Sequence, residues 1–302
     1  MNEDQKKKLI ELIGEENVVF DEPMNKHTTF RIGGNAESFV RVQSTKEMDV
    51  LTDFCRENDI PFFLLGKGSN ILVGDNGIPG VVAYFGEEMS SITVKGNMII
   101  AEAGATLAAV ANTALQKGLT GFEFAAGIPG SVGGALRMNA GAYGGDMAQV
   151  VEWVRVLSPD GEIKTLTNEE MEFGYRHSIL KDIPYIALAA GIALETGDEK
   201  SIRFAMLELA NRRKEKQPLE YPSAGSTFKR PEGYFAGKLI SEAGLSGARI
   251  HDAVVSEKHN GFIINEGCAS AEDVKTLIEI VRRKVYEQSG VLLEPEIIMV
   301  GE

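Results

Sequence analysis

The sequence predicts an α+β protein, because helical and strand-like segments are mixed along its 302 residues without a regular βαβ alternation. Apolar residues make up 43% and charged residues 25% of the chain, a composition typical of a globular protein with a buried core. A chain of this length corresponds to about two domains and is also compatible with three small ones.

The first third of the chain carries clear helix and strand signals. Residues 3–13 place leucines and isoleucines on one face and predict a short amphipathic helix. Ser44, with a glutamate three residues later, forms a capping-box pattern that starts a second helix ending near residue 58. Thr106 is expected to cap a third helix, which Gly118 ends. Short apolar runs predict strands at residues 62–65, 71–73, 81–84 and 98–101.

The remaining elements are expected in a similar mixture. Residues 151–157 and 163–166 predict a hairpin around a Pro-Asp-Gly turn. Residues 185–194 form the longest apolar run, which predicts a buried strand and is too short to span a bilayer. Helices are predicted at residues 201–214, after Asp198, and from Ser270 to about residue 288. Residues 291–300 predict a final strand that Pro295 interrupts.

Charge and cysteine content restrict the class of protein. The net charge of −13 argues against a nucleic-acid partner and favours an enzyme that acts on small molecules. Cys55 and Cys268 are too few and too far apart for a disulfide framework or zinc ribbon, and the four histidines show no metal-ligand spacing. The N-terminus lacks the apolar core of a signal peptide. We therefore expect a cytoplasmic monomer with no metal and no membrane partner.

Two glycine-rich segments indicate a ligand. Glycine allows backbone N–H groups to approach phosphate oxygens closely. Gly66–Asn70 matches neither the dinucleotide fingerprint nor the P-loop, and by itself it is equally compatible with a hairpin turn between the two strands that flank it. Gly127–Gly145 contains seven glycines in nineteen residues, which weakens any regular element there. It indicates a ligand close to the backbone, and a flexible lid is the alternative.

Several strings occur in one order from about residue 25 to the C-terminus. They are TFRIGG (29–34), LGKGSN (65–70), GIPGSVGG (127–134), NAGAYG (139–144), GYRHS (174–178), AGSTFK (224–229) and LEPE (293–296). With them the chain resembles the UDP-N-acetylenolpyruvoylglucosamine reductases, flavoenzymes of peptidoglycan synthesis. Between Arg176 and Asp198 there is no room for the tyrosine-bearing loop of the longer family type, so the chain resembles the shorter type.

The resemblance implies a flavoprotein of three domains. Residues 1–85 and 86–197 would be two FAD-binding subdomains of the vanillyl-alcohol-oxidase type, and residues 198–302 an α+β domain that binds the substrate. It implies non-covalent FAD and NADPH as hydride donor. The implied FAD-binding residues all come from the two glycine-rich segments: Gly66, Gly68, Ser69, Asn70, Gly127, Ile128, Pro129, Gly130, Ser131, Gly133, Gly134, Asn139 and Gly141.

The implied reaction is reduction of UDP-N-acetylglucosamine enolpyruvate to UDP-N-acetylmuramate. Arg176 suits the substrate carboxylate, because a guanidinium binds a carboxylate bidentately and the interaction strengthens as negative charge develops there. Ser226 suits the acid that protonates the resulting carbanion. Glu296 would either hydrogen-bond the enediolate or relay the proton. The alternatives are another FAD-dependent oxidase or dehydrogenase acting on a small alcohol, and a regulator that has lost catalysis.

The substrate diphosphate requires a basic site within an acidic chain. Residues 203–258 contain ten Lys/Arg and seven Asp/Glu. Within this stretch, Tyr221, Lys229 and Lys238 are the expected contacts for the UDP-sugar. The run of basic residues at 212–214 and 216 is interpreted as a solvated helix face.

Overall fold

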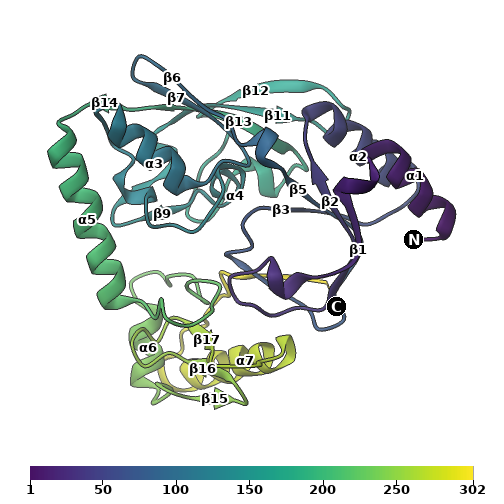
Figure 1. Cartoon of the computed structure of the whole chain (residues 1–302). Helices are drawn as coiled ribbons and strands as arrows, with labels where there is room; N and C mark the ends of the chain where they lie inside the picture. Colours follow the sequence, from purple (N-terminus) through teal and green to yellow (C-terminus); the bar gives the residue numbers. More distant parts are fainter. Residues whose placement is uncertain (302) are drawn as a thin grey trace. The chain divides into compact units, whose positions relative to one another are not determined.

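Helices and strands are mixed along the whole chain, as expected for an α+β protein (Figure 1). The computed structural model describes residues 1–301. By its internal contacts the chain divides into two compact units, each built from three separate segments. Unit 1 comprises residues 1–19, 39–67 and 81–213, and unit 2 comprises residues 20–38, 68–80 and those from 214 on. The proposed three-domain division at residues 85 and 197 stays a prediction.

The core of unit 1 lies between a five-stranded antiparallel sheet and two helices (Figure 1). The strand order is β12 (Ile163–Thr167), β11 (Val151–Leu157), β13 (Ile186–Ala193), β7 (Met98–Glu102) and β6 (Ile92–Lys95). Helices α3 (Leu107–Gln116) and α4 (Val132–Met138) pack against β7, and α4 also packs against β13. The predicted hairpin and buried central strand are confirmed, as is the cap of α3 by Thr106.

A second, four-stranded sheet has the order β1 (Val18–Pro23), β2 (Asn35–Val42), β5 (Ile78–Phe85) and β3 (Phe62–Leu65). The two predicted N-terminal helices are confirmed as α1 (Glu3–Ile13) and α2 (Thr45–Glu57), which pack against each other. Strands β1 and β2 carry no signal that the sequence analysis recognised. Two short pairs complete unit 1, β8 (Leu119–Thr120) with β14 (Glu195–Thr196) and β9 (Gly141–Ala142) with β10 (Gly145–Asp146).

The two strands on either side of Gly66–Asn70 do not pair with each other. β3 runs parallel to β5, whereas β4 (Ile71–Val73) runs parallel to β18 (Ile298–Val300) at the end of the chain. The hairpin alternative for this loop is therefore wrong. The predicted strand at residues 291–300 is also too long, because Pro295 makes only an isolated bridge and regular pairing begins at Ile298.

The glycine-rich segment contains a helix that its composition argued against. Helix α4 starts at Ser131, whose Oγ accepts a hydrogen bond from Gly134 N, and ends at Asn139 in the left-handed conformation. Burial of Val132, Ala135 and Leu136 outweighs the roughly 1 kcal/mol that each glycine costs. A flexible lid is therefore a poor description of these residues.

Unit 2 packs helices α6 (Ala236–Glu242) and α7 (Ala271–Ser289) with the strands β15 (Arg249–Ile250), β16 (Ala253–Val255) and β17 (Ile263–Asn265) (Figure 1). Helix α5 (Glu199–Lys216) precedes this part of the chain and confirms the helix expected after Asp198. The core of unit 2 includes residues from distant parts of the sequence, among them Phe30, Ile32, Leu72, Ile240 and Leu277.

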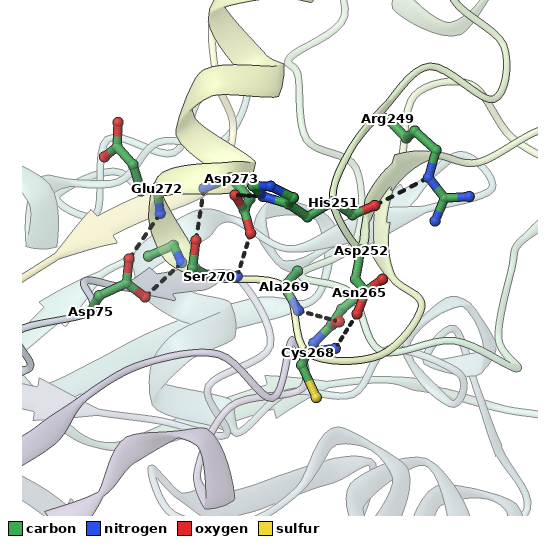
Figure 2. A network of polar contacts seen from close by, with 11 residues as sticks. Asp75, Arg249, His251, Asp252, Asn265, Cys268, Ala269, Ser270, Glu272 and Asp273 are labelled. Carbon is green, nitrogen blue, oxygen red and sulfur yellow. Dashed lines mark hydrogen bonds and ion pairs between the residues drawn. The ribbon is translucent and has the colours of Figure 1, made fainter.

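A polar network holds the start of α7 (Figure 2). Ser270 and Asp273, at the predicted start of this helix, form a capping box, each side chain accepting from the other's backbone N–H at 3.0 Å. The carboxylate of Asp75 accepts from Ala271 N at 2.8 Å and from Glu272 N at 3.0 Å. These bonds satisfy N–H groups that the first helical turn leaves unpaired and tie residue 75 to α7.

The same network contains a titratable pair, since His251 Nδ1 lies 2.7 Å from Asp273 Oδ1. The hydrogen bond and negative charge of Asp273 raise the pKa of His251. Backbone donation from Ser270 and the bond to His251 lower the pKa of Asp273. The histidine contribution is full below its unfolded pKa and is lost as pH rises through the raised value. The carboxylate contribution is present above its unfolded pKa and is lost as pH falls through the lowered value.

The pair should therefore stabilise the protein most between about pH 4 and pH 6.5. We expect His251→Gln to lower the Tm relative to the parent protein at about pH 5.5 and to leave it nearly unchanged at about pH 9. Thermal unfolding followed by circular dichroism at both pH values measures this. Equal losses of Tm at the two pH values would contradict an ionic role for His251.

Candidate functional site

In unit 2, the loop Gly68–Asn70 lies beside Glu296. Strand β4 follows the loop directly and pairs Ile71 with Ile298. Asn70 O accepts from Ile298 N at 2.9 Å, and Asn70 Nδ2 donates to Glu296 O at 3.3 Å. Asn70 makes one of these contacts with its main chain and the other with its side chain. It therefore fixes the main chain of Glu296 next to a segment expected to hold the flavin.

Gly68 is required by the packing of the loop itself. Its φ is +60°, and a Cβ at this position would lie 2.0 Å from His27 O. Gly68 O accepts a hydrogen bond from Thr29 N at 3.0 Å. Only glycine tolerates such an approach, so the segment 27–29 and the loop are in direct backbone contact.

Ser226 and Glu296 belong to neighbouring segments of unit 2. Glu296 N donates to Thr227 O at 2.8 Å, and the next contact is an antiparallel bridge between Phe228 and Pro295. Gly225 has a φ of +76°, and among the described residues nothing lies within 4 Å of a Cβ added there, so the space beside Gly225, the residue before Ser226, is open. The structure thus places the main chain of Glu296 in contact with Asn70 and with Thr227, the residue after Ser226.

In unit 1, several glycines serve close packing of the protein itself. A Cβ on Gly66 would lie 2.8 Å from Ser131 Oγ, one on Gly133 would lie 3.1 Å from Ala103 Cβ, and one on Gly141 would lie 2.6 Å from Gly145 O. Gly133 N already donates to Ala103 O at 2.9 Å. Close packing of the protein itself therefore favours glycine at these positions even without a ligand. The composition alone did not reveal this reason for the glycines.

Other residues of the segment leave the backbone open. Gly127, Pro129 and Gly134 are exposed, and a Cβ on Gly130 would make only an ordinary contact of 3.5 Å. Ser131 is buried and Ile128 half-buried beside them. An exposed glycine backbone next to the first turn of a helix suits a phosphate or a flat ring, so these residues fit FAD.

Arg176 lies at the tip of a tight turn in unit 1. Gly174 and His177 exchange backbone hydrogen bonds of 3.1 and 3.2 Å, and Arg176 has a φ of 55°, uncommon for a residue with a side chain. Its guanidinium lies 5.2 Å from the centre of the exposed Tyr175 ring. Such strain is tolerated only where the surroundings fix the conformation.

Asn139 supplies part of that support. Its Nδ2 donates to Gly174 O and its Oδ1 accepts from Ala148 N, both at 2.9 Å. Asn139 is an expected FAD-binding residue, but both ends of its amide are occupied by the protein. Its side chain connects the glycine-rich segment to the turn that carries Arg176.

Sequence reasoning missed Arg213. It belongs to the basic run interpreted as a solvated face, yet its Nε is buried and has no hydrogen-bond partner among residues 1–301. Its Nη1 would lie 3.3 Å from a Cβ on Gly127, and burial lowers the pKa of the guanidinium. A buried N–H of a cation without a hydrogen-bond partner is costly, so the site suits an anion. Helical spacing could have revealed that Arg213 is partly buried, because it lies on the same helix face as Ile202, Met206 and Leu209.

The three expected contacts for the UDP-sugar all lie in unit 2. Tyr221 is exposed, Lys229 Nζ lies 3.0 Å from Glu294 Oε2, and Lys238 Nζ lies 3.7 Å from Glu242 Oε1. Their role stays a prediction. Within the described part of the chain no group of three or more His, Cys, Asp or Glu could hold a metal ion. None of the helices between residues 1 and 301 is long and apolar enough to cross a bilayer.

Comparison with known families identifies the class of this protein. Residues 36–167 match an FAD-binding domain, and residues 217–300 match the C-terminal domain of UDP-N-acetylenolpyruvoylglucosamine reductases. The chain is therefore an FAD-dependent oxidoreductase of α+β fold. It is 50% identical over 299 residues to the UDP-N-acetylenolpyruvoylglucosamine reductase of Clostridium novyi, covering 99% of this chain and 97% of the relative. The chain belongs to the UDP-N-acetylenolpyruvoylglucosamine reductase family.

Further relatives agree. The reductase of Caldanaerobacter subterraneus subsp. tengcongensis is 53% identical over 295 residues, covering 98% of this chain and 97% of the relative. The crystal structure of the Thermus caldophilus reductase matches with a TM-score of 0.80 and 36% identity, covering 94% of this chain and 98% of that one. A grass pollen allergen with glucose dehydrogenase activity, Phl p 4, matches 65% of this chain and 45% of its own, with a TM-score of 0.52 and 14% identity, which shows a shared fold alone.

Proposed function

We propose that this protein reduces UDP-N-acetylglucosamine enolpyruvate to UDP-N-acetylmuramate for peptidoglycan synthesis, with NADPH as electron donor. The observation that carries the proposal is the position of Glu296, whose N–H donates to the carbonyl of Thr227, the residue after Ser226, and whose carbonyl accepts from Asn70. A hydroxyl and a carboxylate on neighbouring segments suit the protonation of a carbanion, which a dehydrogenase of simple alcohols does not require.

Bound FAD would supply the hydride that adds to the terminal vinyl carbon. Arg176 would bind the substrate carboxylate and stabilise the negative charge that develops there. Ser226 would donate its proton to the carbon that carries the carboxylate, completing addition across the double bond. Glu296 would hydrogen-bond the enediolate or return a proton to the serine. The exposed Gly127 and Gly134 and the half-buried Gly130, with Gly66, Gly68, Ser69 and Asn70, would hold the cofactor.

Binding of the UDP-sugar would use Tyr221, Lys229 and Lys238. We add Arg213 for an anionic group, because its buried Nε lacks a hydrogen-bond partner in the described residues. We propose that the protein acts as a cytoplasmic monomer.

Oxidation of NADPH by the purified, flavin-loaded protein tests the proposal. We expect consumption of NADPH to require the enolpyruvate substrate and to yield UDP-N-acetylmuramate in equal amount. NADH in place of NADPH measures the preference for the donor. NADPH oxidation that does not depend on the substrate would contradict the proposal. Reduction of the flavin by a small alcohol, without any UDP-sugar, would favour the alternative enzyme.

A further inference from the structure

Thr29 connects two loops of unit 2 that are far apart in sequence. Its backbone N–H donates to Gly68 O at 3.0 Å. Its hydroxyl donates to Ser223 O at 2.6 Å, and its own carbonyl accepts from Ser223 N at 3.2 Å. One residue between β1 and β2 therefore holds the loop Gly68–Asn70 on one side and the loop that leads to Ser226 on the other.

The loop carrying Ser226 is anchored at both ends. Thr29 holds it at Ser223, where an isolated bridge to Ile264 adds a second contact. At its other end, Thr227 N donates to Gly261 O at 2.8 Å, and Thr227 Oγ1 accepts from Ile263 N at 2.9 Å. Between these anchors lie only Ala224, Gly225 and Ser226.

The short span between the anchors contains a point of freedom. Gly225 occupies a left-handed conformation with nothing within 4 Å of an added Cβ, so neighbouring atoms do not confine it. Glycine also has more accessible backbone states than any other residue. The position of Ser226 therefore depends on the anchors. Among them, the short bond from the Thr29 hydroxyl comes from a residue that also contacts the Gly68–Asn70 loop directly.

We propose that Thr29 is a positioning residue for proton donation by Ser226. Its hydroxyl holds the Ser223–Ser226 loop in register with the Gly68–Asn70 loop, which itself holds Glu296 through Asn70. Hydride and proton are delivered to adjacent carbons of one bound substrate. The source of each must therefore be placed to within about 1 Å, an error at which rates fall by about 100-fold. The inference rests on the proposed function.

Thr28 provides a matched control. It is the neighbouring threonine, it is 6% exposed, and its hydroxyl donates to Ile32 O at 3.2 Å within the same segment. This bond reaches neither the flavin loop nor the loop of Ser226. Thr28→Val therefore removes a hydroxyl of the same kind without touching the proposed connection.

The test compares the two half-reactions of Thr29→Val, Thr29→Ser and Thr28→Val in the full-length flavoprotein. Stopped-flow absorbance follows flavin reduction by NADPH and then its reoxidation by the enolpyruvate substrate. We expect Thr29→Val to slow reoxidation by about 10- to 100-fold while flavin reduction stays within about twofold. Thr29→Ser, which keeps the hydroxyl, should restore reoxidation. Thr28→Val should lower the Tm without changing the ratio of the two rates.

Three results would overturn the role of Thr29: unchanged reoxidation in Thr29→Val, no recovery in Thr29→Ser, or the same selective loss in Thr28→Val. Failure of the parent protein to be reoxidised by the enolpyruvate substrate is a different outcome. It would contradict the proposed function itself. The three results that concern Thr29 can be obtained only if the enolpyruvate substrate reoxidises the flavin of the parent protein.

Discussion

Replacing Ser226 with alanine is expected to leave reduction of the flavin by NADPH intact and to slow reoxidation by the enolpyruvate substrate by about 100- to 10,000-fold. The first half-reaction needs no proton on the substrate carbon. The second needs a donor for the carbanion, and the hydroxyl on the segment next to Glu296 is the proposed one. Stopped-flow absorbance of the flavin under anaerobic conditions separates the two steps.

Ser223→Ala is the control for this experiment. Ser223 lies three residues earlier in the same loop and makes its contacts with Thr29 through the main chain, which alanine preserves. We expect near-normal rates for both steps. If Ser226→Ala reoxidises as quickly as the parent protein, the proton comes from another group. In that case the product formed in D₂O would still carry deuterium from the solvent, but the deuterium would reach the substrate carbon through a group other than Ser226.

Replacing Arg176 with lysine should lower kcat/KM for the enolpyruvate substrate by about 100- to 1000-fold. Lysine keeps the positive charge but loses the planar pair of donors that matches a carboxylate. It also keeps a Cβ at the φ of 55°, so the strain of the turn is the same in both proteins. Steady-state kinetics over a range of substrate concentrations measures the loss, and flavin reduction by NADPH should not change.

Arg203→Lys makes the same exchange at an exposed arginine of α5, which pairs with Glu199 in its own helix at 2.6 Å. We expect kcat/KM within about twofold of the parent value, because lysine keeps the charge and an exposed ion pair within one helix contributes little. An Arg176→Lys variant as active as this control would show that charge alone meets the need of the substrate carboxylate. Arg176 would then not act as a bidentate ligand.

Local sequence signals predicted the elements that depend on neighbouring residues. The caps at Ser44, Thr106 and Ser270 are recognisable because the bonds that form them join residues three apart. Pairing of β4 with β18 was not predictable in the same way. Residues 71 and 298 become neighbours only through the packing of unit 2, and no local pattern records that partnership.

The site shows the same division. Arg176, Ser226 and Glu296 are predicted site residues, proposed from strings that match a family. The main-chain bond from Glu296 to Thr227, the residue after Ser226, is one that no side-chain pattern encodes. Arg213 was misread because a run of like charges usually faces solvent. Its burial depends on where α5 meets the segment of Gly127, which is a tertiary contact.

The discontinuous make-up of unit 2 has a consequence for synthesis on the ribosome. Phe30, Ile32 and Leu72 are at most 3% exposed, and the rest of their core comes from residues after 223. These three side chains stay exposed until most of the chain has emerged from the ribosome. Synthesis proceeds at about 5 to 20 residues per second. A fragment limited to residues 217–300 would lack these three side chains and expose the surface they cover. The loop of Ser226 therefore gains its anchor at Thr29 only after translation is nearly complete.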